Sequence, residues 1–596
     1  MAPQRAEQIL SWMQNFDDAD VRPDRYTFNT VLHSYAKAGG GQEAAVKASE
    51  LLRKMHDMYR KGNHNAKPDT ISYNVVCNCW AKSGGNGAVE AEKLLAEMHE
   101  LNEAGDRDIK PNAVTYGAVL DAYAKSGKPD AAQRADRLLA KMISLYQSDP
   151  DKNRDLAPTT FLMNTVINAW AKAKEPSKAE EMLVAMTRMA SSKLQPDTFT
   201  YTCVIDAWSK SGFRGAATRA HELLDRMEEL GIKANSYTFN AVIAALAKSG
   251  EAARAERVLM SMVNRGDDDA RPTTINFNTC LDAYAKSGGG RAAAERAEEI
   301  LQWMSKLHRQ GNRDVQPDTI SFNAVLDAWA RSGDRMAPRR AEAILDHMDE
   351  LYRAGERAVK PDVFSYNTLI NAYAKCSLKG SAQRAEYILS VMEKRYRDGD
   401  TQVKPNTRTM TSVIDAWAKS GEAGAAEHAE QLFDHMLTRY ESSGEVDVKP
   451  NVHTANAVCN ACAFSKHPED KELALKIALR VFKWLSGQSD MKPDSYSYTI
   501  LLSVCGNLID EPVSRFEHAR FFFESARDAG YVNDYVLRKL RVIVSEQEYM
   551  TLVGYHADNI PAAWSRNTKA SAPNRSRRGN SNHNNNNSWS GRRRGR

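Results

Sequence analysis

Long apolar runs are missing from this chain of 596 residues. No stretch approaches 18 consecutive apolar residues, which is the rough minimum for a membrane-spanning helix. Cysteine is scarce, and we interpret the eight present as reduced, mostly buried side chains rather than as a disulfide framework. Charge of one sign is not in excess, because 81 basic and 76 acidic residues leave a net charge of +5. A phosphate-binding glycine loop, a dinucleotide-binding fingerprint and a nucleophile elbow are also absent, so these enzyme sites are not predicted.

The chain is instead dominated by self-similarity. Residues 73–82 (YNVVCNCWAK), 322–331 (FNAVLDAWAR) and 366–375 (YNTLINAYAK) are variants of one pattern. Each is followed by a segment rich in Ala, Glu and Leu that ends in Met, and then by a polar stretch that closes on Pro-Asp or Pro-Asn. Twelve such copies follow one another at spacings of 38 to 47 residues. A repeat of this period indicates a solenoid, in which each copy needs its neighbours to bury its apolar face.

Each copy has the pattern of a helical hairpin. We take position one as the residue after the Pro-X pair. Most copies have an aromatic residue at position four, large apolar residues at seven and eight, and Tyr or Trp at eleven, spacings that trace one face of an α-helix. Eight copies place Gly at position fifteen, where a helix end favours a residue that tolerates positive φ. A second helix follows, and the fold predicted is therefore all-α. The copies begin at Arg25, Thr70, Ala113, Thr160, Thr198, Ser236, Thr274, Thr319, Val363, Thr407, Val452 and Ser495.

The two ends differ from the middle. Residues 1–13 match the internal second helix at 336–348, so residues 1–24 are predicted to be the second helix of an incomplete repeat. Twelve repeats then span 25–534, and a capping helix is expected in 535–558. Residues 559–596 are rich in Arg, Asn, Ser and Gly and are predicted to be disordered. Nine Lys or Arg and no acid lie in 564–596, so the rest of the chain carries a net −4.

The combined pattern resembles the pentatricopeptide repeat family. It reads T-Y-N-x-(L/V)-(I/L)-(D/N)-A-(W/Y)-A-K-S-G, then A-x-x-(L/I)-L-x-x-M and K-P-(D/N), and it covers about nine-tenths of the chain. The resemblance implies a right-handed α-solenoid, a P-type array without a C-terminal catalytic domain. It also implies binding of single-stranded RNA, with one base per repeat. The copies are longer than is usual in the family, and the extra residues are expected at loops and helix ends, where they leave the inner face intact.

The resemblance assigns base reading to position five and to the last position of each repeat. Ten of the twelve pairs combine Asn or Thr with Asp or Asn; the pair Gly117 with Thr159 is off the pattern. The remaining residues, paired in order, are Asn29 with Asp69, Asn74 with Asn112, Asn164 with Asp197, Thr202 with Asn235, Asn240 with Thr273, Asn278 with Asp318, Asn323 with Asp362, Asn367 with Asn406, Thr411 with Asn451, Asn456 with Asp494, and Thr499 with Asp534.

Hydrogen-bond chemistry gives these pairs a rationale. A carboxylate only accepts, so Asp suits uracil or guanine, whose ring nitrogen carries a proton, whereas an Asn amide can donate to adenine or cytosine. At position five, Thr leaves room for a purine and Asn fills the space beside a pyrimidine. With Y for a pyrimidine and N for an unassigned base, the target implied is U-Y-N-U-A-Y-U-U-Y-A-U-G.

Two further positions are predicted to complete an RNA groove. Position two is apolar or aromatic in ten repeats, as expected for side chains that sandwich bases. Position thirteen is a cation in ten repeats, which would form a regular stripe for phosphates. The alternative is that these cations only complement the helix dipole. They are Lys37, Lys82, Lys125, Lys172, Lys210, Lys248, Lys286, Arg331, Lys375 and Lys419.

No catalytic residue, metal site or cofactor is predicted. His428, Glu430, Cys459 and Cys462 superficially match a zinc-deaminase signature, but they lie inside repeats. The function predicted is sequence-specific RNA binding in organellar RNA processing, stability, editing or translation, in the mitochondrion or plastid and with processing or translation proteins as further partners. Two alternatives are a protein-binding α-solenoid scaffold and a nuclease or editing enzyme whose catalytic domain is missing from this sequence.

Overall fold

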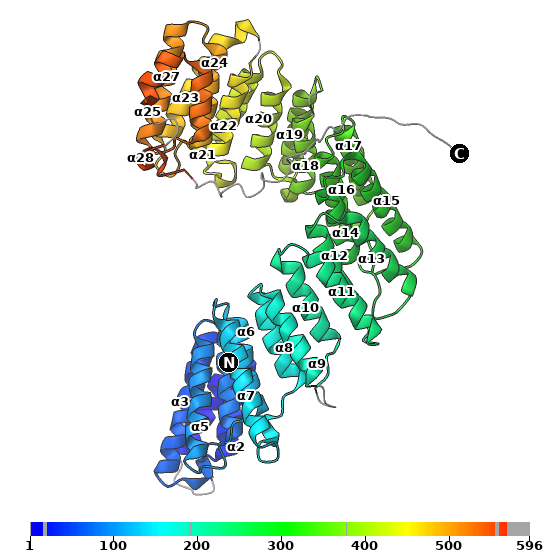
Figure 1. The fold of residues 1–596 in the computed structure, drawn as a ribbon, viewed down its shortest axis with the longest axis vertical. Helices are drawn as coiled ribbons and strands as arrows, with labels where there is room; N and C mark the ends of the chain where they lie inside the picture. The colour runs from blue at the N-terminus through cyan, green and yellow to red at the C-terminus, as the bar shows by residue number, and fades with distance from the viewer. Residues whose placement is uncertain are drawn as a thin grey trace, which may run out of the picture. The chain divides into compact units, whose positions relative to one another are not determined.

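The computed structural model describes residues 2–15, 21–189, 194–376, 378–465, 467–554 and 560–568 (Figure 1). It divides into two units, Met1–Pro361 and Asp362–Arg596, and each is a row of antiparallel helix pairs. The predicted all-α solenoid of stacked hairpins is thereby confirmed.

In the first unit, every complete repeat contributes one first helix and one second helix, and α1 is a further second helix. The first helices are α2 (Arg25–Ala38), α4 (Thr70–Ser83), α6 (Ala113–Ser126), α8 (Thr160–Lys172), α10 (Thr198–Ser211), α12 (Ser236–Lys248), α14 (Thr274–Lys286) and α16 (Thr319–Arg331). The second helices are α1 (Ala2–Gln14), α3 (Gly41–Arg60), α5 (Gly87–Glu103), α7 (Ala131–Ser148), α9 (Pro176–Arg188), α11 (Ala216–Glu229), α13 (Ala252–Arg265), α15 (Gly290–Arg309) and α17 (Ala337–Arg353).

The second unit continues the same alternation. Its first helices are α18 (Val363–Lys375), α20 (Thr407–Ser420), α22 (Val452–Ala463), α24 (Ser495–Leu508) and the shorter α26 (Asp534–Ile543). Its second helices are α19 (Ser381–Arg397), α21 (Ala425–Ser443), α23 (Lys471–Gly487), α25 (Pro512–Asp528) and α27 (Glu546–Val553), and the chain described ends after α28 (Ala562–Ser565).

Within each unit, the first helices form one layer because each packs against the first helices before and after it. The second helices pack mainly against the flanking first helices and form the other layer. Position four points into the core between the layers, where Phe28, Tyr73 and Tyr116 are completely buried. The Met that closes most second helices is buried too, as Met98 and Met304 illustrate. Each large apolar side chain buried this way stabilises the fold by roughly 1.5–3 kcal/mol.

The helix ends follow the sequence signals. All eight glycines at position fifteen have positive φ, for example 66° at Gly39 and 72° at Gly212. At the other end, the Asp, Asn or Thr at the last position of each repeat is the N-cap of the next first helix. The same short polar residue therefore ends one repeat and starts the next helix.

The extra residues of the longer repeats lengthen the second helix at both ends, as expected. In α15, which has 20 residues, 14 precede Met304 and five follow it, whereas in α13, which has 14 residues and belongs to a repeat of 38, ten precede Met262 and three follow it. At the edge where the second helices end, most of the longer repeats form a turn of 3-10 helix: η2 (His64–Ala66), η3 (Arg154–Leu156), η4 (Arg357–Val359), η5 (Thr401–Val403) and η6 (Val446–Val448). A further 3-10 turn, η7 (Pro468–Asp470), directly precedes α23.

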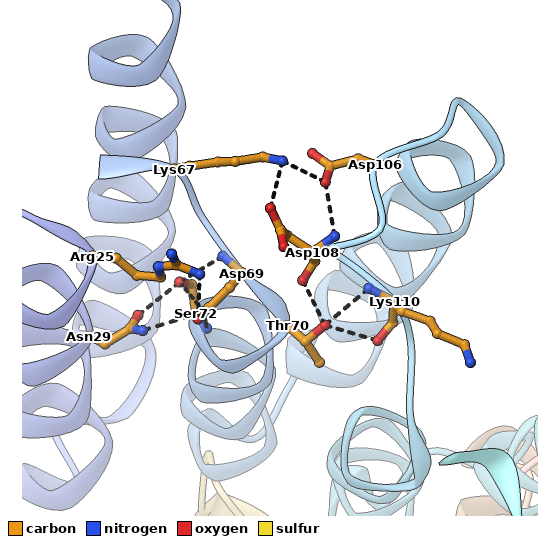
Figure 2. Close-up of polar contacts among 9 residues, drawn as sticks. All are labelled: Arg25, Asn29, Lys67, Asp69, Thr70, Ser72, Asp106, Asp108 and Lys110. Carbon is orange, nitrogen blue, oxygen red and sulfur yellow. Dashed lines mark hydrogen bonds and ion pairs between the residues drawn. The ribbon is translucent and has the colours of Figure 1, made fainter. Parts of the chain in front are cut away.

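At this edge, polar contacts join consecutive repeats (Figure 2). The hydroxyl of Thr70, at position one, donates to the backbone carbonyls of Asp108 and Lys110, at 3.1 and 3.0 Å. Lys67 pairs with Asp106 and Asp108, both at 2.8 Å. Thr70 thus ties the start of α4 to the loop that ends its own repeat, and Lys67 ties the end of the preceding repeat to that same loop.

The two ends of the chain show how far the repeat extends. Helix α1 takes the place of a second helix, since Glu7 accepts a hydrogen bond from Tyr35 at 2.6 Å. Residues 535–558, predicted as one capping helix, contain α27 and most of α26, of which α26 packs on α24 like a further first helix.

The predicted disorder from residue 559 onward is wrong for residues 560–568. Trp564 packs its ring edge-on against Phe523, and its carbonyl accepts from Val532 at 2.8 Å. Asn567 donates to the carbonyl of Ala529 at 2.8 Å. The rest of the predicted tail, 569–596, lies outside the described residues. Among the described helices, no segment is long and apolar enough to cross a bilayer.

Candidate nucleic-acid interface

Position two forms a row of exposed apolar side chains on the first helices. The ten apolar residues at this position have exposed fractions between 43% (Phe364) and 78% (Tyr26). The two exceptions, Arg408 and His453, are exposed as well. Large apolar groups that stay in water at the same place in ten repeats are typical of a contact surface. The row comprises Tyr26, Ile71, Val114, Phe161, Phe199, Tyr237, Ile275, Ile320, Phe364 and Tyr496.

The residues predicted to read one base lie next to each other in space. Asn29 donates through Nδ2 to Oδ1 of Asp69 at 3.3 Å, although 40 residues separate them (Figure 2). The same bond joins the predicted pairs of repeats two, four and seven: Asn74 with Asn112 at 3.4 Å, Asn164 with Asp197 at 3.3 Å, and Asn278 with Asp318 at 3.1 Å.

A third residue, at position three of the following repeat, completes each pair, and the sequence reasoning missed it. Ser72 donates to Oδ1 of Asn29 at 2.8 Å and lies 2.9 Å from Oδ1 of Asp69, while its own amide donates to Asp69. Its side chain is completely buried. The signal was present, because Ser or Thr follows the last-position residue by three in ten repeats, the spacing of a capping box.

This network separates two roles within the last-position residue. Its Oδ1 accepts from the helix amide, the position-three hydroxyl and, in the four pairs named above, the position-five amide. Those bonds are the same for Asp and for Asn, so capping alone explains why the last position is restricted to short polar residues. It does not explain the choice between them, which concerns only the second atom, Oδ2 of Asp or Nδ2 of Asn. That atom is where an acceptor and a donor differ.

Position five is the more buried member of the pair. Asn29 and Asn164 are 8% and 6% exposed, whereas Asp197 is exposed. In repeat five, position five is Thr202, and its hydroxyl bonds to the position-three hydroxyl of Thr238 instead, at 2.6 Å. The same contact in repeat ten joins Thr411 and Thr454 at 2.8 Å. Position five therefore shapes and orients the site more than it presents free polar atoms.

The predicted pairs of repeats three and six deviate from this arrangement. In repeat three, the residue at position three of the next repeat is the apolar Leu162, and a Cβ on Gly117 would lie 3.2 Å from it. The off-pattern pair Gly117 with Thr159 therefore has no polar network. Asn240 accepts from Thr279 at 2.9 Å, and no bond joins it to Thr273. The residues Asn323 and Asp362 belong to different units. In the second unit, the remaining position-five asparagines, Asn367 and Asn456, are buried. The position-five residue Thr499 donates to the carbonyl of Ser495. The last-position residues of this unit are N-caps: Asn406, Asn451 and Asp494.

The last predicted pair is corrected by one residue. The N-cap of α26 is Asn533, whose Oδ1 accepts from the amides of Tyr535 and Val536, both at 3.1 Å. Asp534 is the first helical residue and corresponds to position one. The partner of Thr499 is therefore Asn533, because the absence of Pro before it shifted the alignment.

The predicted groups meet in a groove between α10 and α12. The groove has a volume of about 970 Å³, large enough for a flat ring. Its walls contain two residues from each predicted class, so that position two, position five, the last position and position thirteen face one space. These eight lining residues are Phe199, Tyr237, Thr202, Asn240, Asp197, Asn235, Lys210 and Lys248.

The ten predicted phosphate-contacting cations are all exposed in the last turns of first helices. They do not form a uniform stripe. Lys82, Lys172 and Lys248 donate to carbonyls of the preceding first helix. Four others pair with an aspartate one turn earlier in their own helix: Lys125, Lys210, Lys286 and Arg331.

The residues of the deaminase-like pattern are structural. His428 stacks on Trp417 at 4.0 Å between ring centroids. Cys459 and Cys462 are buried, and burial raises the pKa of the Cys459 thiol to about 12. Within the part of the chain that the structure describes, no three His, Cys, Asp or Glu side chains are arranged to hold a metal ion.

Family models match repeats of the first unit and the first repeat of the second unit. The pentatricopeptide repeat domain matches residues 222–287, 305–375 and 353–419, and the PPR repeat matches 26–58, 114–144 and 161–189. The chain belongs to the pentatricopeptide repeat family. No curated protein matches it.

Among solved pentatricopeptide repeat proteins, the crystal structure of PPR10 from maize is 18% identical, with a TM-score of 0.42, and the match covers 93% of this chain and 82% of that one. PPR10 in complex with an 18-nt psaJ RNA element is 18% identical, with a TM-score of 0.32, and the match covers 94% and 87%.

Proposed function

We propose that this pentatricopeptide repeat protein binds single-stranded RNA sequence-specifically, with one base per repeat. The observation that carries the proposal is the groove between α10 and α12. Phe199 and Tyr237 flank it, Asp197 and Asn235 present polar atoms, and lysines line it. Apolar faces for stacking, short hydrogen-bonding groups for base edges and cations for phosphates are the three elements of single-strand recognition.

Each repeat is expected to bind one nucleotide, and we call that nucleotide position a register. The base preferred at each register follows from the second polar atom of the last-position side chain, Oδ2 of Asp or Nδ2 of Asn. Oδ2 of Asp accepts the ring proton of uracil, and Nδ2 of Asn donates to the bare ring nitrogen of adenine or cytosine. With the last pair corrected to Thr499 and Asn533, the expected target is U-Y-N-U-A-Y-U-U-Y-A-U-A. Binding would act by occupancy or by recruiting processing, editing or translation proteins to an organellar transcript.

The experiment that tests the proposal is selection of bound RNA from a random pool with the full chain. We expect enrichment of single-stranded sequences that contain the U-A step of registers four and five and the U-U step of registers seven and eight. An enriched pool without a common sequence contradicts base reading. Failure to retain any RNA favours the protein-binding scaffold, since capping restricts the last position in either function.

The segment 569–596 is expected to raise the affinity for RNA without affecting which sequence is preferred. Residues 569–596 contain eight Lys or Arg and no acid. Deleting them is expected to lower affinity for all RNAs by a similar factor and to flatten the salt dependence, because cations that contact phosphates do not read bases. Titrations of matched and scrambled RNA at several salt concentrations measure this. The deletion starts at Lys569 so that Trp564 stays docked. A changed sequence preference would contradict the assignment.

The proposed organellar location rests on family membership and is tested separately. Import of the complete gene product, fused to a fluorescent protein, into mitochondria or plastids supports it. Retention outside both organelles contradicts it.

A further inference from the structure

Seven of the ten cations at position thirteen fall into two groups that differ in their partner. In repeats two, four and six, the ammonium crosses to the preceding first helix. Lys82 donates to the carbonyl of Ala36 at 2.7 Å, and Lys248 donates to that of Ser209 at 2.7 Å. The third member, Lys172, donates to the carbonyl of Ala124 at 2.9 Å.

In the other group, the cation stays on its own helix. Lys125 pairs with Asp121 and Lys210 pairs with Asp206, both at 2.6 Å. Repeats seven and eight have the equivalent pairs, Lys286 with Asp282 at 2.6 Å and Arg331 with Asp327 at 2.7 Å. In every case the aspartate is at position nine, four residues before the cation.

Position nine explains the division. A carboxylate at position nine lies one helical turn below position thirteen, the spacing at which side chains on a helix meet. Where position nine is Asn78, Asn168 or Ala244, that position offers the cation no carboxylate. The ammonium then turns to the C-terminal carbonyls of the preceding helix, which have no partner within that helix and lie at the negative end of its dipole.

The second unit contains an independent instance of the crossing contact. In repeat twelve, position nine is Ser503 and position thirteen is Asn507. Asn507 donates through Nδ2 to the carbonyl of Ala463 at 2.7 Å, again across to the preceding first helix. The geometry therefore belongs to the repeat, and it does not require a lysine.

The two groups differ in net charge. A lysine on a neutral carbonyl keeps its full positive charge, whereas a lysine paired with an aspartate adds nothing to the net charge of the groove. The paired groups remain in contact with solvent, since the side chain of Lys210 is 59% exposed and that of Asp206 is 36% exposed. Both line the groove between α10 and α12, as does Lys248 beside Ala244. From repeat two to repeat seven, uncompensated and compensated cations alternate.

We propose that the residue at position nine decides which repeats hold RNA phosphates. The lysines of repeats two, four and six bind phosphate, and the aspartate-paired lysines of repeats three, five and seven contribute little to phosphate binding. Phosphate binding thus recurs at every second nucleotide along this stretch. The inference rests on the proposed RNA binding and replaces the uniform cationic stripe expected from the sequence.

Two triple variants with the same change in charge test this. One is Lys82→Ala, Lys172→Ala and Lys248→Ala; the other is Lys125→Ala, Lys210→Ala and Lys286→Ala. For single strands, each lost phosphate contact lowers the slope of log K against log salt by about 0.7. We expect a loss of about 2 in slope for the first variant and less than half of that for the second. When the salt concentration falls from 200 to 50 mM, the affinity of the first variant is then expected to rise roughly 16-fold less than that of the wild type.

A charge-neutral exchange separates the cause from folding effects. Asn168→Asp with Asp206→Asn moves one aspartate from repeat five to repeat four. In this background, Lys172→Ala is expected to become nearly silent and Lys210→Ala to cost the slope of one phosphate. Lysine-to-arginine variants at the first three sites should retain the wild-type slope, and circular dichroism melting checks that each variant is folded.

The outcomes of these experiments test the role of position nine separately from the proposed RNA binding. Equal losses for the two triple variants, or an exchange that leaves both single substitutions unchanged, overturn the role of position nine. Wild-type protein that shows no salt-dependent affinity for single-stranded RNA overturns the proposed function itself.

Discussion

Exchanging the base-reading pairs of repeats four and five is expected to exchange the two bases that they prefer. The variant carries Asn164→Thr and Asp197→Asn in repeat four with Thr202→Asn and Asn235→Asp in repeat five. The wild type should prefer U-A at these registers, and the variant should prefer A-U. Each mispaired base is expected to cost about 1–3 kcal/mol by analogy with base-edge readout, or roughly 5- to 150-fold in affinity.

The local structure supports this exchange without loss of folding. Asp and Asn are nearly equivalent as N-caps, so α10 and α12 keep their caps. Both position-five residues face a threonine at position three of the next repeat, Thr200 and Thr238. Each new side chain therefore meets the hydroxyl that its counterpart meets in the wild type. The net charge of the protein is unchanged.

Four titrations measure the effect, the wild type and the variant each against U-A and A-U targets of otherwise equal sequence. A control pair of targets differs only at register three, where Gly117 leaves no polar network, and both proteins should bind that pair alike. An unchanged preference in a folded variant would refute base reading by these positions.

Replacing Glu256 by Gln is expected to destabilise the joint between repeats six and seven. Glu256, on α13, is 7% exposed and accepts hydrogen bonds from Tyr284 on α14 and from Arg296 on α15. One carboxylate thus ties together three helices of two repeats. An amide oxygen is a weaker acceptor and an amide group donates where both partners already donate, so we expect a loss of about 1–3 kcal/mol in the free energy of unfolding at neutral pH.

The loss should depend on pH with a defined sign. Burial acts to raise the pKa of Glu256, but the hydrogen bonds from Arg296 and Tyr284 outweigh it, and the pKa lies below the usual 4.5. A depressed carboxyl pKa stabilises the folded state above the unfolded value and loses that contribution as pH falls through the folded value. The difference between wild type and variant is therefore expected to be constant near pH 7 and to shrink below about pH 4.5.

Urea unfolding at pH 7 and pH 4 measures this, and hydrogen exchange of α13 and α14 shows whether the loss is local. Glu299→Gln is the matched control, because Glu299 also pairs with Arg296 but is 59% exposed. We expect nearly no effect from it. Equal losses from the two substitutions would show that burial of Glu256 does not strengthen the joint.

Several features of this protein could be predicted because they depend on short stretches of chain. The 3.6-residue apolar period, the glycines at helix ends and the Met of the second helices identified hairpins that had to stack. Once the repeat register was known, Asn29 and Asp69 could be paired across 40 residues, since stacking brings the same two positions together in every copy. The sequence alignment is wrong by one residue where the Pro before the last position is absent: it predicts Asp534, whereas the N-cap is Asn533.

What only the tertiary structure decided concerns atoms that meet between repeats. The buried Thr200 holds Oδ1 of Asp197 in the capping network, and under the proposed function Oδ2 is the atom that meets a base. Lys82 lies within reach of the carbonyl of Ala36 only because α4 packs beside α2, whereas Lys125 finds Asp121 on its own helix. A local pattern specifies each helix and its caps. The partners of exposed polar groups are set by the packing of neighbouring helices, because such groups take the nearest carboxylate or free carbonyl that the packing supplies.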